Sequence, residues 1–293
     1  MLKPPINAQL YNRFMADLKS KFGFVNGVLC LLLFASGGFA QQPRPAAPAA
    51  KPAATTGRAN VFSVSSKGGL FTVPQVQLPD AAAAARLNLA LVRAALVPEL
   101  ETPPQPLTAR RGVQQAQAEY EANQRSGFVA ARYRVLYNDH GLLSVAFVNE
   151  YLGAYPSAAE RHATFDVRTG RPVRLRELVA DTVALRRLWR QRIGARVAER
   201  LRTLRTEFPD VDAEMAADIS QRLGWDTARR QVQFERNAPS FQDFAVTPAA
   251  LVLYHDYEFP HVIEALEPAA GYSFRYAELR AWLRPQGQLG FRR

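Results

Sequence analysis

The chain has 293 residues, of which 48% are hydrophobic, and a formal net charge of +11. This length allows a substantial buried core, as one large domain or two small ones, and we expect one composite domain. The only cysteine is Cys30, which excludes an internal disulfide framework and a metal site built from several thiolates.

The first 40 residues have the organisation of a secretory signal peptide. Basic residues up to Lys21 are followed by an apolar run over residues 22–34 and by small residues over 35–40. This order predicts export to the periplasm or the medium, with cleavage after Ala40. A retained membrane anchor is the alternative, although Asn26 and several glycines keep the apolar run short of the roughly 20 residues that a spanning helix needs. No stable transmembrane span is expected after processing.

Residues 41–59 are rich in proline and alanine and lack the apolar side chains of a core, which predicts a linker. Loss of residues 1–40 removes four basic residues and one acidic residue, so the net charge falls from +11 to +8. Such a surface can meet anionic glycans, lipid headgroups or wall polymers. Because export separates the chain from nucleic acid, we expect no nucleic-acid partner.

The first ordered elements are predicted from residue 60. Apolar residues alternate imperfectly over 61–64 and 70–76, which indicates two strands. Asp80 suits an N-cap, and the alanine- and leucine-rich segment after it predicts a buried helix that ends before Pro98. Residues 110–125 are polar and weakly helical.

A β-hairpin is predicted next, because apolar residues recur at even spacing over 128–137 and again over 142–151. The turn-forming residues between them support this interpretation. A third strand over 162–167 is expected to enter a tight turn that ends at Arg171.

A long amphipathic helix is predicted over residues 185–208, where apolar residues recur every three or four positions. Arginines occupy the remaining face. They can cover apolar surface with their stems while the charged ends stay hydrated, or they can contact an anionic envelope polymer. The arginines are Arg186, Arg187, Arg190, Arg196, Arg200 and Arg202.

The last third of the chain predicts a short helix over 210–223, strands over 241–247, 250–257 and 272–274, and a helix over 276–283. Runs of strands with helices between them indicate an α+β fold. We expect a mainly antiparallel sheet with helices packed on one face, over residues 60–285, and a tail over 286–293.

Three segments, at 137–145, 164–170 and 175–178, resemble the extracellular domain of RsiV-type anti-sigma factors, which also occurs beside the catalytic domain of PdaC-type peptidoglycan deacetylases. Residues 244–258 and 276–279 are similar to the closing strands and helix of that family. The resemblance implies an α+β domain of unknown function that binds or senses a ligand outside the cytoplasm. It also implies a family loop after the central strand, in which Tyr155 stands where histidine is expected.

The same resemblance implies a secreted protein such as lysozyme as a partner. Lysozyme is cationic, so a chain with a net charge of +8 is not expected to attract it strongly. An anionic cell-wall polymer fits better on charge alone.

The densest polar cluster follows the strand over 250–257 and is expected to alternate, with His255 and Tyr257 on one face. Together with Tyr155 and Glu258, they are the candidate ligand-binding residues. A histidine–carboxylate pair can also perform acid–base chemistry, which keeps open a hydrolase that uses the region from His255 to Glu264. An ordinary polar strand end is the third interpretation.

Neither a metal nor another cofactor is expected. The four histidines lack the i, i+4 helical spacing of paired metal ligands. Thr164-Phe165-Asp166 would begin a deacetylase metal motif, but Val167 stands where that motif needs a second aspartate. We therefore expect an exported, non-enzymatic binding or sensing domain of the cell envelope, whose ligand is a cell-wall glycan or a secreted protein. The alternative is an envelope carbohydrate or peptide hydrolase, and a purely structural role is the third.

Overall fold

The computed structural model describes residues 57–122, 127–153, 156–234, 238–285 and 289. The predicted signal peptide, the cleavage after Ala40, most of the linker over 41–59 and candidate residue Tyr155 lie outside these ranges. None of the helices within the described ranges is long and apolar enough to cross a membrane.

The first described elements are a hairpin and two helices. Strands β1 (Asn60–Ser65) and β2 (Thr72–Gln77) pair antiparallel. Helix α2 (Ala81–Leu96) begins where the Asp80 carboxylate accepts hydrogen bonds from two backbone N–H groups, at 2.8 and 3.1 Å. Helix α3 (Ala109–Glu121) is capped by Thr108 in the same way.

The central sheet is antiparallel, with the strand order β3-β4-β5-β6. Its strands are β3 (Phe128–Asp139), β4 (Leu142–Leu152), β5 (Pro156–Asp166) and β6 (Arg171–Pro172), and the short helix α4 (Leu175–Leu178) follows them. The β3–β4 turn places His140 and Gly141 at positive φ, 52° and 79°, a backbone shape that glycine adopts easily. The hairpin predicted from sequence is therefore present, and β5 begins earlier than expected, at Pro156.

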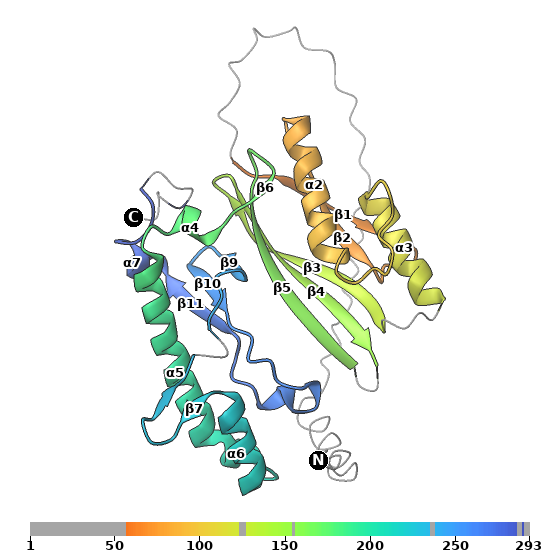
Figure 1. Ribbon diagram of the computed structural model, residues 1–293. Helices are drawn as coiled ribbons and strands as arrows, with labels where there is room; N and C mark the ends of the chain where they lie inside the picture. The colour runs from red at the N-terminus through yellow and green to blue at the C-terminus, as the bar shows by residue number, and fades with distance from the viewer. Residues whose placement is uncertain (1–56, 123–126, 154–155, 235–237, 286–288, 290–293) are drawn as a thin grey trace, which may run out of the picture.

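The second half of the chain is built on a long helix. The elements are α5 (Thr182–Glu207), α6 (Ala213–Arg222), β7 (Trp225–Asp226), β8 (Gln231–Val232), β9 (Phe244–Val246), β10 (Ala250–Tyr254), the 3-10 helix η1 (His261–Leu266), β11 (Gly271–Arg275) and α7 (Tyr276–Leu279). Strands β11, β10 and β9 form a second antiparallel sheet, and β7 and β8 form a small hairpin. Figure 1 shows α6 and β7 near one end of α5.

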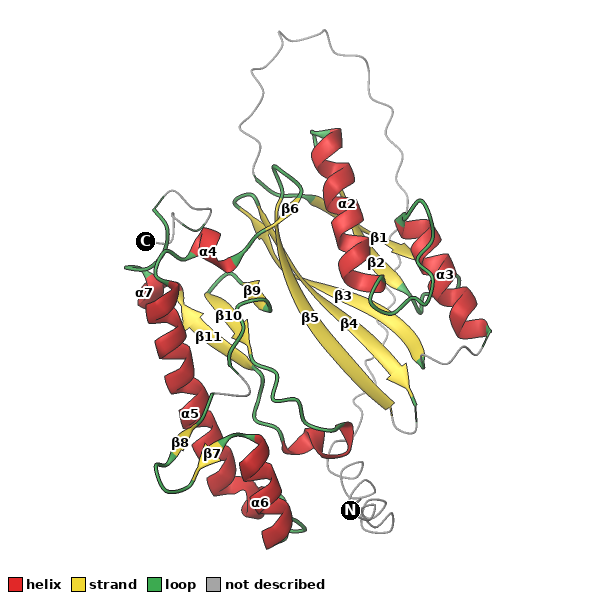
Figure 2. Ribbon diagram, viewed as in Figure 1, coloured by secondary structure: helices red, strands yellow, loops and turns green. Residues whose placement is uncertain are grey.

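The predicted α+β class with antiparallel pairing is confirmed, but the prediction of one sheet under one layer of helices is wrong. The strands form two larger sheets and two separate hairpins. Helix α2 lies beside the central sheet, α3 packs against α2 and the β1–β2 hairpin, and α5 lies beside the β9–β11 sheet (Figure 2). The physical reason is that strand β4 is apolar on both sides, so that two different layers can cover it.

Two hydrophobic cores result. Leu143, Val145 and Phe147 of β4 belong to the core shared with α2 and α3. Leu142, on the opposite side of the same strand, belongs to the core shared with α5. Residues 142–147 are consequently all buried, although a sheet with one wet face would show alternating burial.

The two sheets are joined by polar contacts as well as by packing. The Val246 backbone N–H donates to Ser144 Oγ at 3.1 Å. His162 of β5 is buried, with Nδ1 3.0 Å from Asp243 Oδ1 and Nε2 3.0 Å from Glu160 Oε1. Its ring stacks on Tyr254 of β10 with 3.6 Å between ring centroids. His162 therefore links the central sheet to the β9–β11 sheet.

The arginines of α5 hold the helix to β11 and its flanking loop. Arg192 donates to the Ser273 carbonyl at 2.5 Å, Arg196 to Gly271 at 2.7 Å, and Arg200 to Glu267 at 3.1 Å. The Arg196 guanidinium also lies 3.8 Å from the centroid of the Tyr272 ring and Arg192 lies 4.5 Å from that of Phe274. These arginines therefore cover internal surface, but their charged ends bond to backbone carbonyls instead of staying hydrated. Contact of this face with an anionic envelope polymer stays a prediction.

Candidate functional site

His255 lies just past the end of β10 and is held there by its backbone. Its N–H donates to the Ala270 carbonyl at 3.0 Å, which keeps the segment beside the start of β11. The side chain is 6% exposed and meets the Trp189 ring edge-on at 6.2 Å and the Tyr257 ring at 4.6 Å. Within the described ranges, the imidazole forms no hydrogen bond.

Burial determines the charge of this imidazole. It lowers the pKa of His255 from 6.5 to about 4, and the nearby Asp256 carboxylate offsets only part of that effect. At neutral pH the ring is uncharged, so one nitrogen donates a hydrogen bond and the other accepts one. Neither ring nitrogen has a hydrogen-bond partner in the part of the chain that the structure describes.

The predicted alternation along this segment is confirmed. His255 and Tyr257 are buried, whereas Asp256 and Glu258 are exposed. Glu258 has a positive φ of 55°, and its backbone N–H donates to Asp256 Oδ1 at 2.7 Å, which stabilises this conformation. The Glu258 carboxylate forms neither a hydrogen bond nor an ion pair with any described residue.

Three of the four candidate residues line one open groove with a volume of about 810 Å³. They are His255, Tyr257 and Glu258. The opposite wall comes from α6 and the β7–β8 hairpin, and the residues there that matter for the chemistry are Asp218, Gln221, Arg222, Trp225, Asp226 and Gln233. The sequence did not single out this wall, since strands of two residues are too short to show a periodic pattern.

Helix α6 presents its polar face to the groove because its apolar side is used elsewhere. Ile219 is fully buried in the α5 core, so Asp218 and Arg222, on another side of the helix, reach the groove and pair with each other at 2.8 Å. The helix begins at an Asp212 N-cap. It ends before Gly224, where φ is 63° and an added Cβ would lie 2.8 Å from the Gln233 carbonyl oxygen.

The β7–β8 hairpin is closed by Asp226. Its carboxylate accepts hydrogen bonds from the backbone N–H groups of Ala228 and Arg229, at 3.0 and 2.9 Å, and from the Gln233 amide at 2.9 Å. These bonds, the one from the Arg229 backbone first, hold the pKa of Asp226 below its ordinary value. Trp225, the neighbouring residue, is half-buried with part of its surface on the groove.

Tyr257 lines the groove, but its hydroxyl is not free to bind a ligand. Its phenol hydrogen-bonds to the Tyr272 hydroxyl beneath it. Burial raises the pKa of Tyr257 far above its ordinary value, and the contact with Tyr272 adds to the shift. The phenol is therefore protonated at neutral pH, and its hydroxyl is bonded to Tyr272.

A second ionisable group of interest, Glu267, lies beyond the region that the sequence indicated. Its carboxylate accepts a hydrogen bond from the Phe259 N–H at 2.9 Å. Burial raises the pKa of Glu267 to about 7, and the negative charges of Asp256 and Glu264 add to the shift. Glu267 does not line the groove. Within the described ranges, no three His, Cys, Asp or Glu side chains are grouped so as to hold a metal ion.

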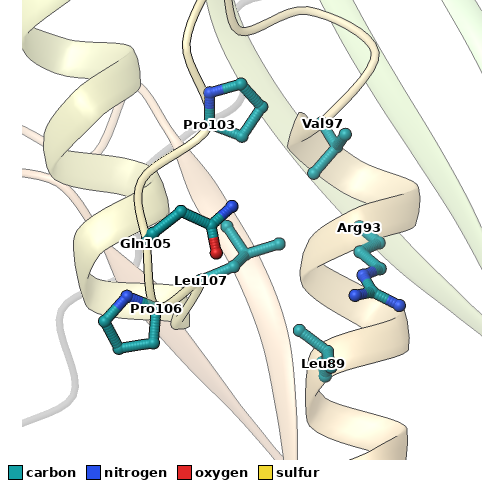
Figure 3. A pocket seen from close by; sticks show the side chains of 7 residues that line it. All are labelled: Leu89, Arg93, Val97, Pro103, Gln105, Pro106 and Leu107. Carbon is teal, nitrogen blue, oxygen red and sulfur yellow. The ribbon is translucent and has the colours of Figure 1, made fainter.

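A smaller hollow of about 450 Å³ lies between α2 and the loop that leads to α3. Figure 3 shows Leu89, Arg93 and Val97 on the helix facing Pro103, Gln105 and Leu107 on the loop. This hollow is mostly apolar and belongs to the other core. It lacks the convergent polar groups that the groove beside His255 has.

Solved structures similar to this chain include two of the DUF3298 family. One is a member of the DUF3298 family from Bacteroides fragilis NCTC 9343, with a TM-score of 0.45 and 14% identity over 78% of this chain and 96% of that one. The other is a DUF3298 family protein from Pseudomonas aeruginosa PAO1, with a TM-score of 0.43 and 16% identity over 78% of this chain and 92% of that one. No family model matches the chain, and no curated protein does. The RsiV-type resemblance stays a prediction.

Proposed function

We propose that this chain is an exported, non-enzymatic binding domain of the cell envelope, and that it holds a segment of cell-wall glycan in the groove beside His255. One observation carries the proposal. A buried, uncharged imidazole lines an open groove and has no hydrogen-bond partner among the described residues. Unfilled polar groups at the wall of a pocket are typical of a ligand site.

The rest of the groove suits a sugar. Glycans present hydroxyl groups that amides and carboxylates bind, and pyranose rings have flat C–H faces that pack on aromatic rings. Gln221 and Gln233 supply amides, and Trp225 supplies a half-buried aromatic surface on the same wall. These groups come from α6 and the β7–β8 hairpin, opposite the segment that carries His255.

Binding is favoured over catalysis because, apart from Glu258, the ionisable groups that the structure describes in the groove are engaged in other contacts or have an unsuitable pKa. A general base works best with a pKa near the operating pH, whereas that of His255 is about 4. Asp226 closes the hairpin turn, and Asp218 is paired with Arg222. The Tyr257 hydroxyl is bonded to Tyr272.

The proposal is tested by co-sedimentation of the purified protein with insoluble peptidoglycan. Trp225→Ala removes the aromatic wall, and Tyr120→Ala is the control, since Tyr120 is an exposed aromatic on α3 outside the groove. We expect the wild type and the Tyr120 variant to sediment and the Trp225 variant to lose at least about tenfold in affinity, which is the effect of removing one stacking contact. Equal binding by all three proteins would place the site elsewhere.

The same purified protein tests two alternatives, which are binding of a secreted protein and hydrolysis of the cell wall. A secreted protein such as lysozyme is tested by pull-down, and capture of lysozyme without capture of peptidoglycan would replace the glycan by a protein partner. The hydrolase alternative was predicted for the region from His255 to Glu264. A half-buried carboxyl, Glu267, lies just beyond that region, and burial raises its pKa to about 7, which suits a general acid. Release of soluble fragments by the wild type and its loss in Glu267→Gln would establish that activity.

Export is part of the proposal and is tested separately. We expect cell fractionation to find the protein outside the cytoplasm, with an N-terminus at Gln41. A cytoplasmic chain with an intact N-terminus would overturn it.

A further inference from the structure

We infer that the glycan segment held in this groove carries free amino groups, which makes the ligand a de-N-acetylated, cationic amino sugar. The inference rests on the proposed function and deepens it by naming the ligand class. It depends on two observations at the same wall. The Glu258 carboxylate is exposed and has no partner among the described residues, and the His255 imidazole is 6% exposed and also without a hydrogen bond there.

The charges that line the groove are opposite in sign to those of the whole chain. Among the residues that the structure describes, three carboxylates line it, those of Asp218, Asp226 and Glu258, against one guanidinium, that of Arg222. Arg222 is paired with Asp218 at 2.8 Å, and Asp226 is bonded within its own hairpin. His255 adds no positive charge at neutral pH because burial lowers its pKa to about 4. Among the described lining residues, Glu258 is therefore the carboxylate without a counter-ion, in a chain whose net charge after the predicted cleavage is +8.

An ammonium group matches these two side chains in hydrogen bonding as well as in charge. It carries three N–H donors and no acceptor. One donor suits the Glu258 carboxylate in a charge-assisted bond, and another suits the accepting nitrogen of the neutral His255 ring. An acetamido group offers a single N–H and brings a carbonyl oxygen, which the carboxylate would repel.

Lysine side chains of a protein carry the same ammonium group, but the remaining wall favours a sugar. Trp225 is half-buried and can pack against one face of a pyranose ring, and the neutral amides of Gln221 and Gln233 bind hydroxyl groups. A lysine stem has no hydroxyl groups to satisfy these amides. The amino sugar has groups that match the two amides and Trp225 as well as Glu258 and His255, whereas the lysine ammonium matches only Glu258 and His255.

The inference is tested by calorimetric titration with two oligosaccharides of equal length, a β-1,4-linked glucosamine tetramer and its fully N-acetylated form, at about pH 6, where the amine is protonated. The variant is Glu258→Gln. The control is Glu121→Gln, since Glu121 is an exposed carboxylate of α3 outside the groove. We expect the wild type and the control to bind the glucosamine tetramer about tenfold more tightly than the acetylated one, and Glu258→Gln to abolish that preference.

The outcomes distinguish failure of the amino-sugar preference from failure of glycan binding itself. Equal affinity for the two tetramers, or tighter binding of the acetylated one, would overturn the inference and leave glycan binding in place. Binding of neither tetramer would overturn glycan binding and the inference with it. Tighter binding of a lysine tetramer than of the glucosamine tetramer would identify a cationic protein as the ligand and overturn the amino sugar.

Discussion

The buried imidazole of His255 should make the stability of the protein depend on pH. Burial lowers its pKa from 6.5 to about 4 in the folded state. Between these two values the unfolded chain binds a proton that the folded chain does not, so stability falls as the pH drops from about 6.5 to 4 and is unaffected by His255 above that range. The full shift corresponds to about 3 kcal/mol.

Glu267 acts in the opposite direction and has to be removed before the effect can be measured. Burial raises its pKa to about 7 from 4.5, so its ionisation destabilises the folded state as the pH rises from 4.5 to 7. Glu267 is only half-buried, which reduces its contribution to about 1 kcal/mol. In the wild type the two groups therefore partly cancel.

The assay is urea unfolding at pH 7.5 and pH 5, with Glu267→Gln as the reference and Glu267→Gln with His255→Phe as the test. Glutamine keeps an acceptor for the Phe259 N–H, and phenylalanine keeps an aromatic ring beside Trp189. We expect the reference to lose about 2 kcal/mol more than the test protein between the two pH values. Parallel losses in the two proteins would refute a buried, neutral His255.

Three further substitutions test other parts of the fold. Gly170→Ala should cost at least about 2 kcal/mol, because its Cβ would lie 2.3 Å from the Ala83 carbonyl oxygen. The control, Gly68→Ala, has a similar positive φ but open space around the added Cβ, and should cost about 1 kcal/mol. Equal melting temperatures of the two variants would contradict the close approach at Gly170. His162→Phe should cost about 1 to 3 kcal/mol in urea unfolding, because it removes the two ring hydrogen bonds, although Asp243 keeps the backbone N–H of residue 162 and Glu160 keeps Arg134. An unchanged midpoint would show that the link between the sheets is dispensable. Glu258→Gly should stabilise the protein by up to about 1 kcal/mol, since glycine tolerates a φ of 55°, and it should lower the affinity for the ligand. A decrease in both the free energy of unfolding and the ligand affinity would contradict the backbone strain at Glu258.

Much of the local structure could be predicted because it depends on neighbours in the chain. The Asp80 cap, the start of α2 and its end before Pro98 follow from capping and proline geometry. The hairpin around His140 and Gly141 follows from turn chemistry. The alternating burial from His255 to Glu258 continues beyond the strand and also follows from the extended backbone.

The candidate site was only half predicted. His255, Tyr257 and Glu258 were singled out as a polar cluster, and they do line one groove. Its opposite wall, with Trp225, was missed, because a hairpin with two strands of two residues leaves no periodic signal. Glu267 was missed as well, since its pKa depends on burial and on carboxylates that the fold brings near.

The sequence by itself determined the longer elements, their order and their apolar sides, because those depend on contacts within a few residues along the chain. Only the tertiary structure decided that the strands divide into two sheets, that the arginines of α5 bond to β11, and that a polar strand end faces α6 across a groove. These features join residues that are far apart in the chain. Periodicity tells which side of an element is apolar, and it does not tell which partner covers that side.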